Sequence, residues 1–80
     1  MFKKRLGVEL SERALLCPTG RNCPDILELE SGDYAVIGKD ITSEALPFLP
    51  AGSGCGFDER VVRIPRVVLV AARPDIPPQV

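Results

Sequence analysis

The residues of this chain best suited to chemistry are its three cysteines, Cys17, Cys23 and Cys55. Cysteine thiolates bind zinc tightly, and a structural zinc site typically has about four ligands that are paired roughly two to four residues apart. Cys17 and Cys23 have five residues between them, and the chain contains no histidine. A zinc site would therefore need Asp25, Asp58 or a second copy of the chain to complete its ligands.

The same thiols have alternatives to zinc. A Cys17–Cys23 or Cys23–Cys55 disulfide would form in an oxidising compartment, whereas cytoplasmic thiols are normally kept reduced. An odd number of cysteines fits reduced, partly buried thiols. We therefore expect no cofactor, and zinc binding or a redox-responsive disulfide stays open as the alternative.

The inventory of side chains also predicts that the protein is not an enzyme. Histidine most readily carries protons near neutral pH, and the chain has none. A cysteine nucleophile needs a base beside it, and the candidates are carboxylates or distant lysines. Residues 52–56 are rich in glycine but lack the Gly-Lys-Ser/Thr ending of a phosphate-binding loop, and Asp58 and Glu59 follow them. We predict no catalytic residues and no cofactor-binding residues.

The charge balance argues against a nucleic-acid partner. Ten Lys and Arg residues against eleven Asp and Glu give a net charge of −1, so there is no basic excess to neutralise a phosphate backbone. The basic residues 3–5 are not followed by the apolar run of a signal peptide, because Glu9 and Glu12 interrupt it. No segment approaches the roughly 20 apolar residues of a membrane span. These features predict a cytoplasmic protein without a membrane partner.

A β-hairpin is predicted over residues 26–39. Two short segments rich in β-forming residues surround a turn at Ser31-Gly32-Asp33. In the first segment leucine alternates with glutamate, which is typical of a strand with one exposed face. Residues 34–37 carry apolar side chains on both faces, which indicates a strand covered on both sides.

Further elements are predicted after the hairpin. Asp40 or Thr42 could cap a short helical turn over residues 43–46, which Pro47 ends. Alternating apolar and polar side chains predict a third strand over residues 59–64.

Residues 66–73 fit two structures. A preceding proline at position 65 favours a helix with an apolar face of Val67, Val70 and Ala71. The β-branched valines of the same segment favour a strand. Helix and strand both remain open, with the helix preferred for that apolar face.

The chain length predicts one small domain. A domain of this size buries only about 60% of the surface of its unfolded chain, so its stability margin is small. Leucines at a loose helical spacing predict an arm or weak amphipathic helix over residues 1–16. Residues 17–73 form the predicted domain, and the prolines of residues 74–80 predict an extended tail. The predicted fold class is α+β, with a small antiparallel β-sheet and one or two short helices.

Three segments carry a resemblance to known sequences. They are residues 22–42, with Cys-Pro-Asp-Ile and Gly-Asp-Tyr-Ala-Val-Ile-Gly; residues 58–65, with Asp-Glu-Arg-Val-Val-Arg-Ile-Pro; and residues 72–77, with Ala-Arg-Pro-Asp-Ile-Pro. In this pattern the chain resembles a family of small uncharacterised actinobacterial proteins. The resemblance implies a regulatory or accessory role and assigns no functional residues.

The leading functional hypothesis is a non-catalytic protein–protein interaction or accessory regulatory module. An incomplete sheet has edges that can pair with another chain, and residues 26–30 and 59–64 are the predicted edges. The chain has more valine than so small a core needs, so the predicted apolar interaction surface consists of Val62, Val67, Val68 and Val70. The expected partner is a protein or a second copy in a homodimer. The alternative hypothesis is a cysteine-based zinc-binding or redox-responsive module.

Overall fold

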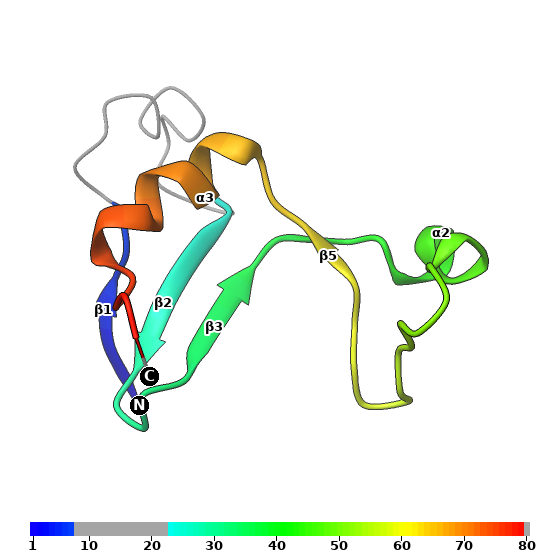
Figure 1. Cartoon of the computed structure of the whole chain (residues 1–80), viewed down its shortest axis with the longest axis horizontal. Coiled ribbons are helices and arrows are strands. Elements are labelled where there is room, and N and C mark those ends of the chain that lie inside the picture. Colours follow the sequence, from blue (N-terminus) through cyan, green and yellow to red (C-terminus); the bar gives the residue numbers. More distant parts are fainter. Residues whose placement is uncertain (8–22, 80) are drawn as a thin grey trace.

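The computed structural model describes residues 1–7 and 23–79. Three strands form an antiparallel sheet in the order β1-β2-β3, with bounds β1 (Phe2–Arg5), β2 (Asp25–Leu29) and β3 (Tyr34–Ile37). A two-stranded ribbon pairs β4 (Lys39–Asp40) with β5 (Val62–Arg63). The helical elements are α2 (Thr42–Ala45), α3 (Arg66–Ala72) and the 3-10 turns η1 (Leu46–Phe48) and η2 (Arg73–Asp75). The predicted α+β fold is confirmed (Figure 1).

The β2–β3 hairpin is confirmed with the predicted turn. Leu29 N–H donates to the carbonyl of Asp33 at 2.8 Å, and Gly32 N–H donates to the carbonyl of Leu29 at 3.0 Å. Gly32 has a φ of 95°, a left-handed conformation that glycine adopts without steric cost. The turn therefore closes on a residue type that suits it, and it fixes the register of the two strands.

The first strand departs from the sequence prediction of an arm or helix. Residues 2–5 form β1 and pair antiparallel with β2, so β2 is the central strand of the sheet. Arg5 Nε donates to Asp25 Oδ2 at 2.5 Å across this pair, and a register shift interrupts the ladder between Phe2 and Lys4. Residues 8–16 of the predicted arm lie outside the described residues.

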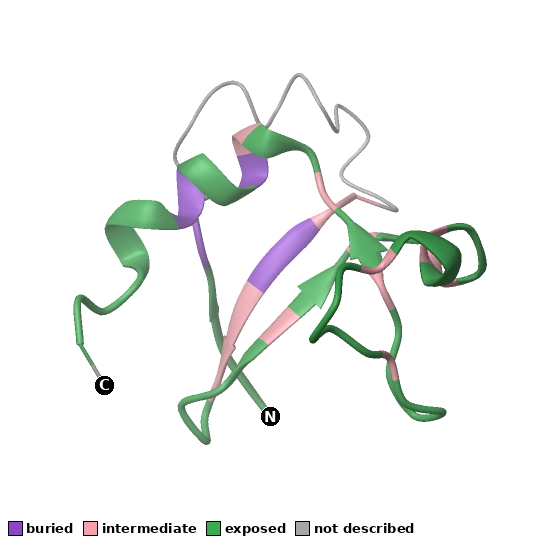
Figure 2. Ribbon diagram, turned by 45° about the vertical axis from the view of Figure 1, so that its right-hand side comes forward, coloured by how far each residue is buried: buried purple, intermediate pink, exposed green. Residues whose placement is uncertain are grey.

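Segment 66–72 is a helix, and it covers one face of the sheet. Its buried residues are Val68, Ala71 and Ala72, which join Leu6 and Ile26 in the core (Figure 2). The predicted apolar face is confirmed at the buried Ala71 and at the half-buried Val67, and it is wrong at Val70, which is 46% exposed. Pro65 at the N-cap position is compatible with the start of the helix because its missing N–H has no helical partner to lose.

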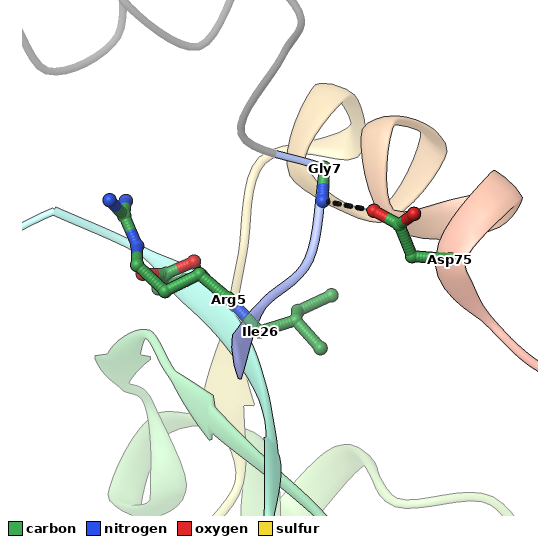
Figure 3. A network of polar contacts seen from close by, with 5 residues as sticks. Arg5, Gly7, Ile26 and Asp75 are labelled. Carbon is green, nitrogen blue, oxygen red and sulfur yellow. Dashed lines mark hydrogen bonds and ion pairs between the residues drawn. The ribbon is translucent and has the colours of Figure 1, made fainter. Parts of the chain in front are cut away.

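Gly7 allows β1 and the C-terminal segment to meet. A Cβ at Gly7 would lie 2.5 Å from the carbonyl carbon of Ala71 and 2.7 Å from the backbone nitrogen of Ala72. The Gly7 N–H also donates to Asp75 Oδ2 at 2.8 Å (Figure 3). The prediction of an extended tail over residues 74–80 is therefore wrong at residues 74–75, which belong to η2, and the Asp75 carboxylate accepts the Gly7 N–H next to β1.

The ribbon and α2 project from the main sheet (Figure 1). The predicted strand over 59–64 is present only as Val62–Arg63, and it pairs with β4 rather than with the hairpin strands. The short helix has Ile41 as its N-cap residue, and Asp40 Oδ1 accepts the Thr42 N–H at 2.9 Å. Pro47 lies in the 3-10 turn that follows α2, so the α-helix ends where the proline predicts.

Gly38 joins β3 to the ribbon, and its replacement by alanine should destabilise the protein by about 1–3 kcal/mol, the usual cost of overpacking. An added Cβ would lie 2.6 Å from the Arg63 carbonyl oxygen and 2.9 Å from Ile64 Cγ2. Gly54→Ala is the control, because nothing lies within 4 Å of a Cβ there. Urea unfolding followed by circular dichroism gives both values. Equal midpoints for the two variants would contradict the close approach at Gly38.

Candidate interaction site

The candidate site begins with the open edge of β3. Among the described residues, β3 is the last strand of its sheet and pairs only with β2. Backbone groups of an antiparallel strand point alternately to its two sides. Since Asp33 accepts the hydrogen bond from Leu29, residues 33, 35 and 37 direct their backbone groups toward β2. Tyr34 and Val36 therefore direct their N–H and C=O groups to the open edge.

The side chains of β3 make this edge apolar and uncharged. Tyr34 is 38% exposed, Val36 is 45% exposed and Ile37 is 52% exposed, whereas Ala35 is half-buried. The prediction that both faces of this strand are covered was therefore wrong for the described residues. Apolar edge strands that carry no charge leave their backbone groups available for pairing with another chain.

The other edge of the sheet is guarded. β1 carries Lys3, Lys4 and Arg5, and its ladder has a register shift next to Phe2. Positive charge and irregular pairing are both devices that prevent the addition of a further strand. The contrast between the two edges selects β3 as the surface for strand addition.

The structure does not bring the predicted edge residues and the four predicted valines together on one surface. Residues 26–30 are not an edge, because β2 is paired on both sides. Val68 is fully buried in the core and is not part of a surface. Val70 and Val62 are 46% and 38% exposed, but they lie on α3 and β5 respectively, and Val67 is half-buried.

The β3 edge was missed because its strand looks like a buried one. Four consecutive uncharged residues are typical of a strand covered on both faces. The available signal was the basic run in residues 3–5, which marks a strand edge that is protected from pairing. Because the sequence predicts an arm or weak helix there, it places an edge at residues 26–30, which is wrong. Val62–Arg63 of the other predicted edge, 59–64, pairs only with β4 among the described residues.

The two described cysteines differ in oxidation state. Cys23 is disulfide-bonded, whereas Cys55 is a half-buried free thiol. The Cys23–Cys55 pairing is therefore wrong, and Cys17, the other candidate partner, lies outside the described residues. Within residues 1–7 and 23–79, no three His, Cys, Asp or Glu side chains form a group that could hold a metal ion. The expectation of reduced thiols is therefore wrong for Cys23 and holds for Cys55. The zinc site of Cys17, Cys23 and Cys55 stays a prediction for the reduced chain.

A groove of about 440 Å³ lies where β3 passes into the ribbon. It is lined by Cys23, Pro24, Ile37, Gly38, Lys39, Arg63, Ile64 and Pro65. Lys39 and Arg63 are directly opposite each other in the β4–β5 register. Like charges in that position repel each other, so an anion next to Lys39 would stabilise this end of β3.

Two titrating side chains flank the β3–β4 segment. Partial desolvation raises the pKa of Tyr34 above its ordinary value of 10.0, and the Glu28 carboxylate on the neighbouring strand raises it further. The Thr42 hydroxyl and backbone N–H hold the pKa of Asp40 below its ordinary value of 3.8, and the charge of Arg60 acts in the same direction. At neutral pH, Tyr34 is therefore uncharged and Asp40 is ionised.

Thr42→Val should raise the pKa of Asp40 toward 3.8, because it removes the hydroxyl that donates to Asp40 Oδ1 at 2.6 Å. A lowered folded-state pKa contributes stability that is present above the unfolded value and lost as pH falls through the folded value. The wild type should therefore lose this contribution below about pH 3.8, and Thr42→Val should lose less. Carboxyl NMR titration measures the pKa. Thr42→Ser, which keeps the hydroxyl, is the control, and an unchanged pKa in the valine variant would refute the assignment.

Comparison with known proteins assigns the chain to no family. No family model, curated protein or solved structure matches the chain. Among the described residues, no helix is long and apolar enough to cross a membrane. The resemblance to small actinobacterial proteins therefore stays an expectation from the sequence.

Proposed function

We propose that this protein is a non-catalytic protein–protein interaction module, with an accessory or regulatory role, that pairs with another polypeptide through the open edge of β3. The observation that carries the proposal is that edge: backbone groups of Tyr34 and Val36 point away from β2, beside exposed apolar side chains. Strand addition supplies affinity through main-chain hydrogen bonds and specificity through alternate side chains. Exposed Leu69 and Val70 on α3 give the same domain a second apolar surface.

Site-specific photo-crosslinking in the cells that make the protein tests this function. A benzophenone amino acid at Tyr34 should give discrete protein adducts, because that side chain flanks the open edge. The same group at Phe57 is the control, since Phe57 is 94% exposed but lies in the loop before β5. Adducts that are absent at Tyr34, or identical at both positions, would refute an interaction through β3.

A redox-responsive function is the second candidate, and the disulfide at Cys23 favours it. Cys23 precedes β2 and lines the groove beside Gly38 and Ile64. Reduction would release a constraint next to the strand that carries Asp25 and Ile26 of the buried interior. A change in the oxidation state of Cys23 would thus alter the constraint on the start of β2.

Reduction should lower the thermal midpoint of the wild type, because breaking a native disulfide typically removes about 2–4 kcal/mol of stability. Differential scanning calorimetry with and without a phosphine reductant measures this change. Cys55→Ser is the control and should show the same loss on reduction, since Cys55 is a free thiol. A midpoint that reductant does not move would exclude the redox function. Zinc bound by the reduced wild type in native mass spectrometry would favour the metal alternative instead.

A further inference from the structure

We propose that the occupant of the β3 edge is a second copy of this chain, paired antiparallel about a two-fold axis at Val36. The proposal rests on the proposed function of that edge and names its partner. In this register Val36 of one copy faces Val36 of the other, and each Asp33 faces Lys39 of the other copy. Two-fold pairing of this kind is self-complementary and closes as a dimer.

The backbone permits this register. Tyr34 and Val36 direct their backbone groups away from β2. Continued alternation past the end of β3 at Ile37 would give Gly38 the same direction. Pairing Val36 with its copy, and Tyr34 with Gly38 of the other copy, brings outward-facing groups together at every contact. A shift by one residue would instead oppose outward groups with inward groups, so that register is excluded.

The charges at the ends of the strand favour the same register. The ion pairs formed among the described residues are Met1–Glu30 and Arg5–Asp25, so neither Asp33 nor Lys39 is in one. Both are exposed. Lys39 faces Arg63 across the β4–β5 pair, so an Asp33 carboxylate from the second copy would compensate the repulsion. The strand between them is uncharged. When two copies of β3 pair antiparallel, the negative end of each strand therefore meets the positive end of the other.

Sedimentation equilibrium of the full-length chain over a concentration series tests the register through a charge swap. Asp33→Lys and Lys39→Asp should each weaken the dimer by about tenfold, because each sets like charges opposite at two symmetric positions. The double variant should restore the wild-type dissociation constant to within about threefold. Lys3→Asp, on the guarded edge of β1, is the matched control and should leave it unchanged.

A proline pair tests the backbone pairing. Val36→Pro should abolish the dimer and leave a folded monomer, because the lost N–H faces the open edge. Ala35→Pro should unfold the hairpin, since its N–H faces β2. Circular dichroism reports folding in each case.

The possible outcomes separate this inference from the proposed function. A wild type that stays monomeric at the highest attainable concentration overturns pairing with a second copy, and so does a double swap no tighter than its single variants. If Tyr34 then still crosslinks to a different protein in cells, the interaction function stands with another partner. A dimer that Val36→Pro leaves intact would place the contact elsewhere and overturn the inference.

Discussion

Replacement of Gly7 by alanine is expected to destabilise the domain by about 2–5 kcal/mol, the largest effect of any single methyl group in the described chain. Gly7 has a φ of 69°, which costs an L-residue about 1–2 kcal/mol. The added methyl would also lie 2.6 Å from the Ala71 carbonyl oxygen, and such overpacking costs about 1–3 kcal/mol more. The neighbour is helix backbone, which cannot rotate aside as a flexible side chain can.

Gly52→Ala separates the two contributions. Gly52 has a φ of 90°, but nothing lies within 4 Å of its Cβ position. This variant should therefore lose only about 1–2 kcal/mol, the conformational part of the effect. Urea unfolding of both variants provides the comparison. A Gly7 variant no less stable than the Gly52 variant would show that β1 and α3 do not meet as described.

Leu6→Ala should destabilise the protein by about 2–5 kcal/mol, the range for deleting a buried leucine side chain. Leu6 has no exposed surface and packs with Ile26, Val68 and Ala72. A domain of this size has a total stability of about 4–12 kcal/mol, at roughly 0.05–0.15 kcal/mol per residue. The variant should therefore lose a large fraction of the total stability and unfold at a lower temperature than the wild type.

Leu69→Ala makes the same chemical change on the exposed side of α3. Leu69 is 55% exposed, and alanine is the better helix former, so its effect should stay within about 0.5 kcal/mol. Chemical denaturation at several pH values gives both free energies. Similar losses in the two variants would mean that α3 is packed on a different face.

The sequence predicted the elements that depend on neighbouring residues. The hairpin followed from alternation around Gly32, and the end of the short helix followed from Pro47. The sequence does not decide between helix and strand at residues 66–72, because the valines favour a strand and the proline before them favours a helix. The burial of Val68 settles its orientation, and that burial depends on contacts with Leu6, far away in the sequence.

The features that the sequence did not predict, β1 and the position of the open sheet edge, depend on contacts between residues far apart in the chain. β1 was missed because Leu6 and Gly7 look like part of a loose helix, and only contact with β2 and α3 gives them their roles. Once β1 occupies one side of β2, the edge moves to β3. The candidate site was therefore wrong at residues 26–30, although the prediction that a sheet edge would be available was confirmed for the described residues.

The packing of Leu6 against Val68 and Ala72 has a consequence for synthesis on the ribosome. The strands β1, β2 and β3 are translated before α3, so the apolar side of the sheet is complete before its cover exists. Contacts between residues so distant in sequence form slowly, because a long loop must close first. Nascent chains with exposed apolar strands aggregate readily. The emergence of α3 therefore sets the moment at which the newly made sheet is first protected from other nascent chains.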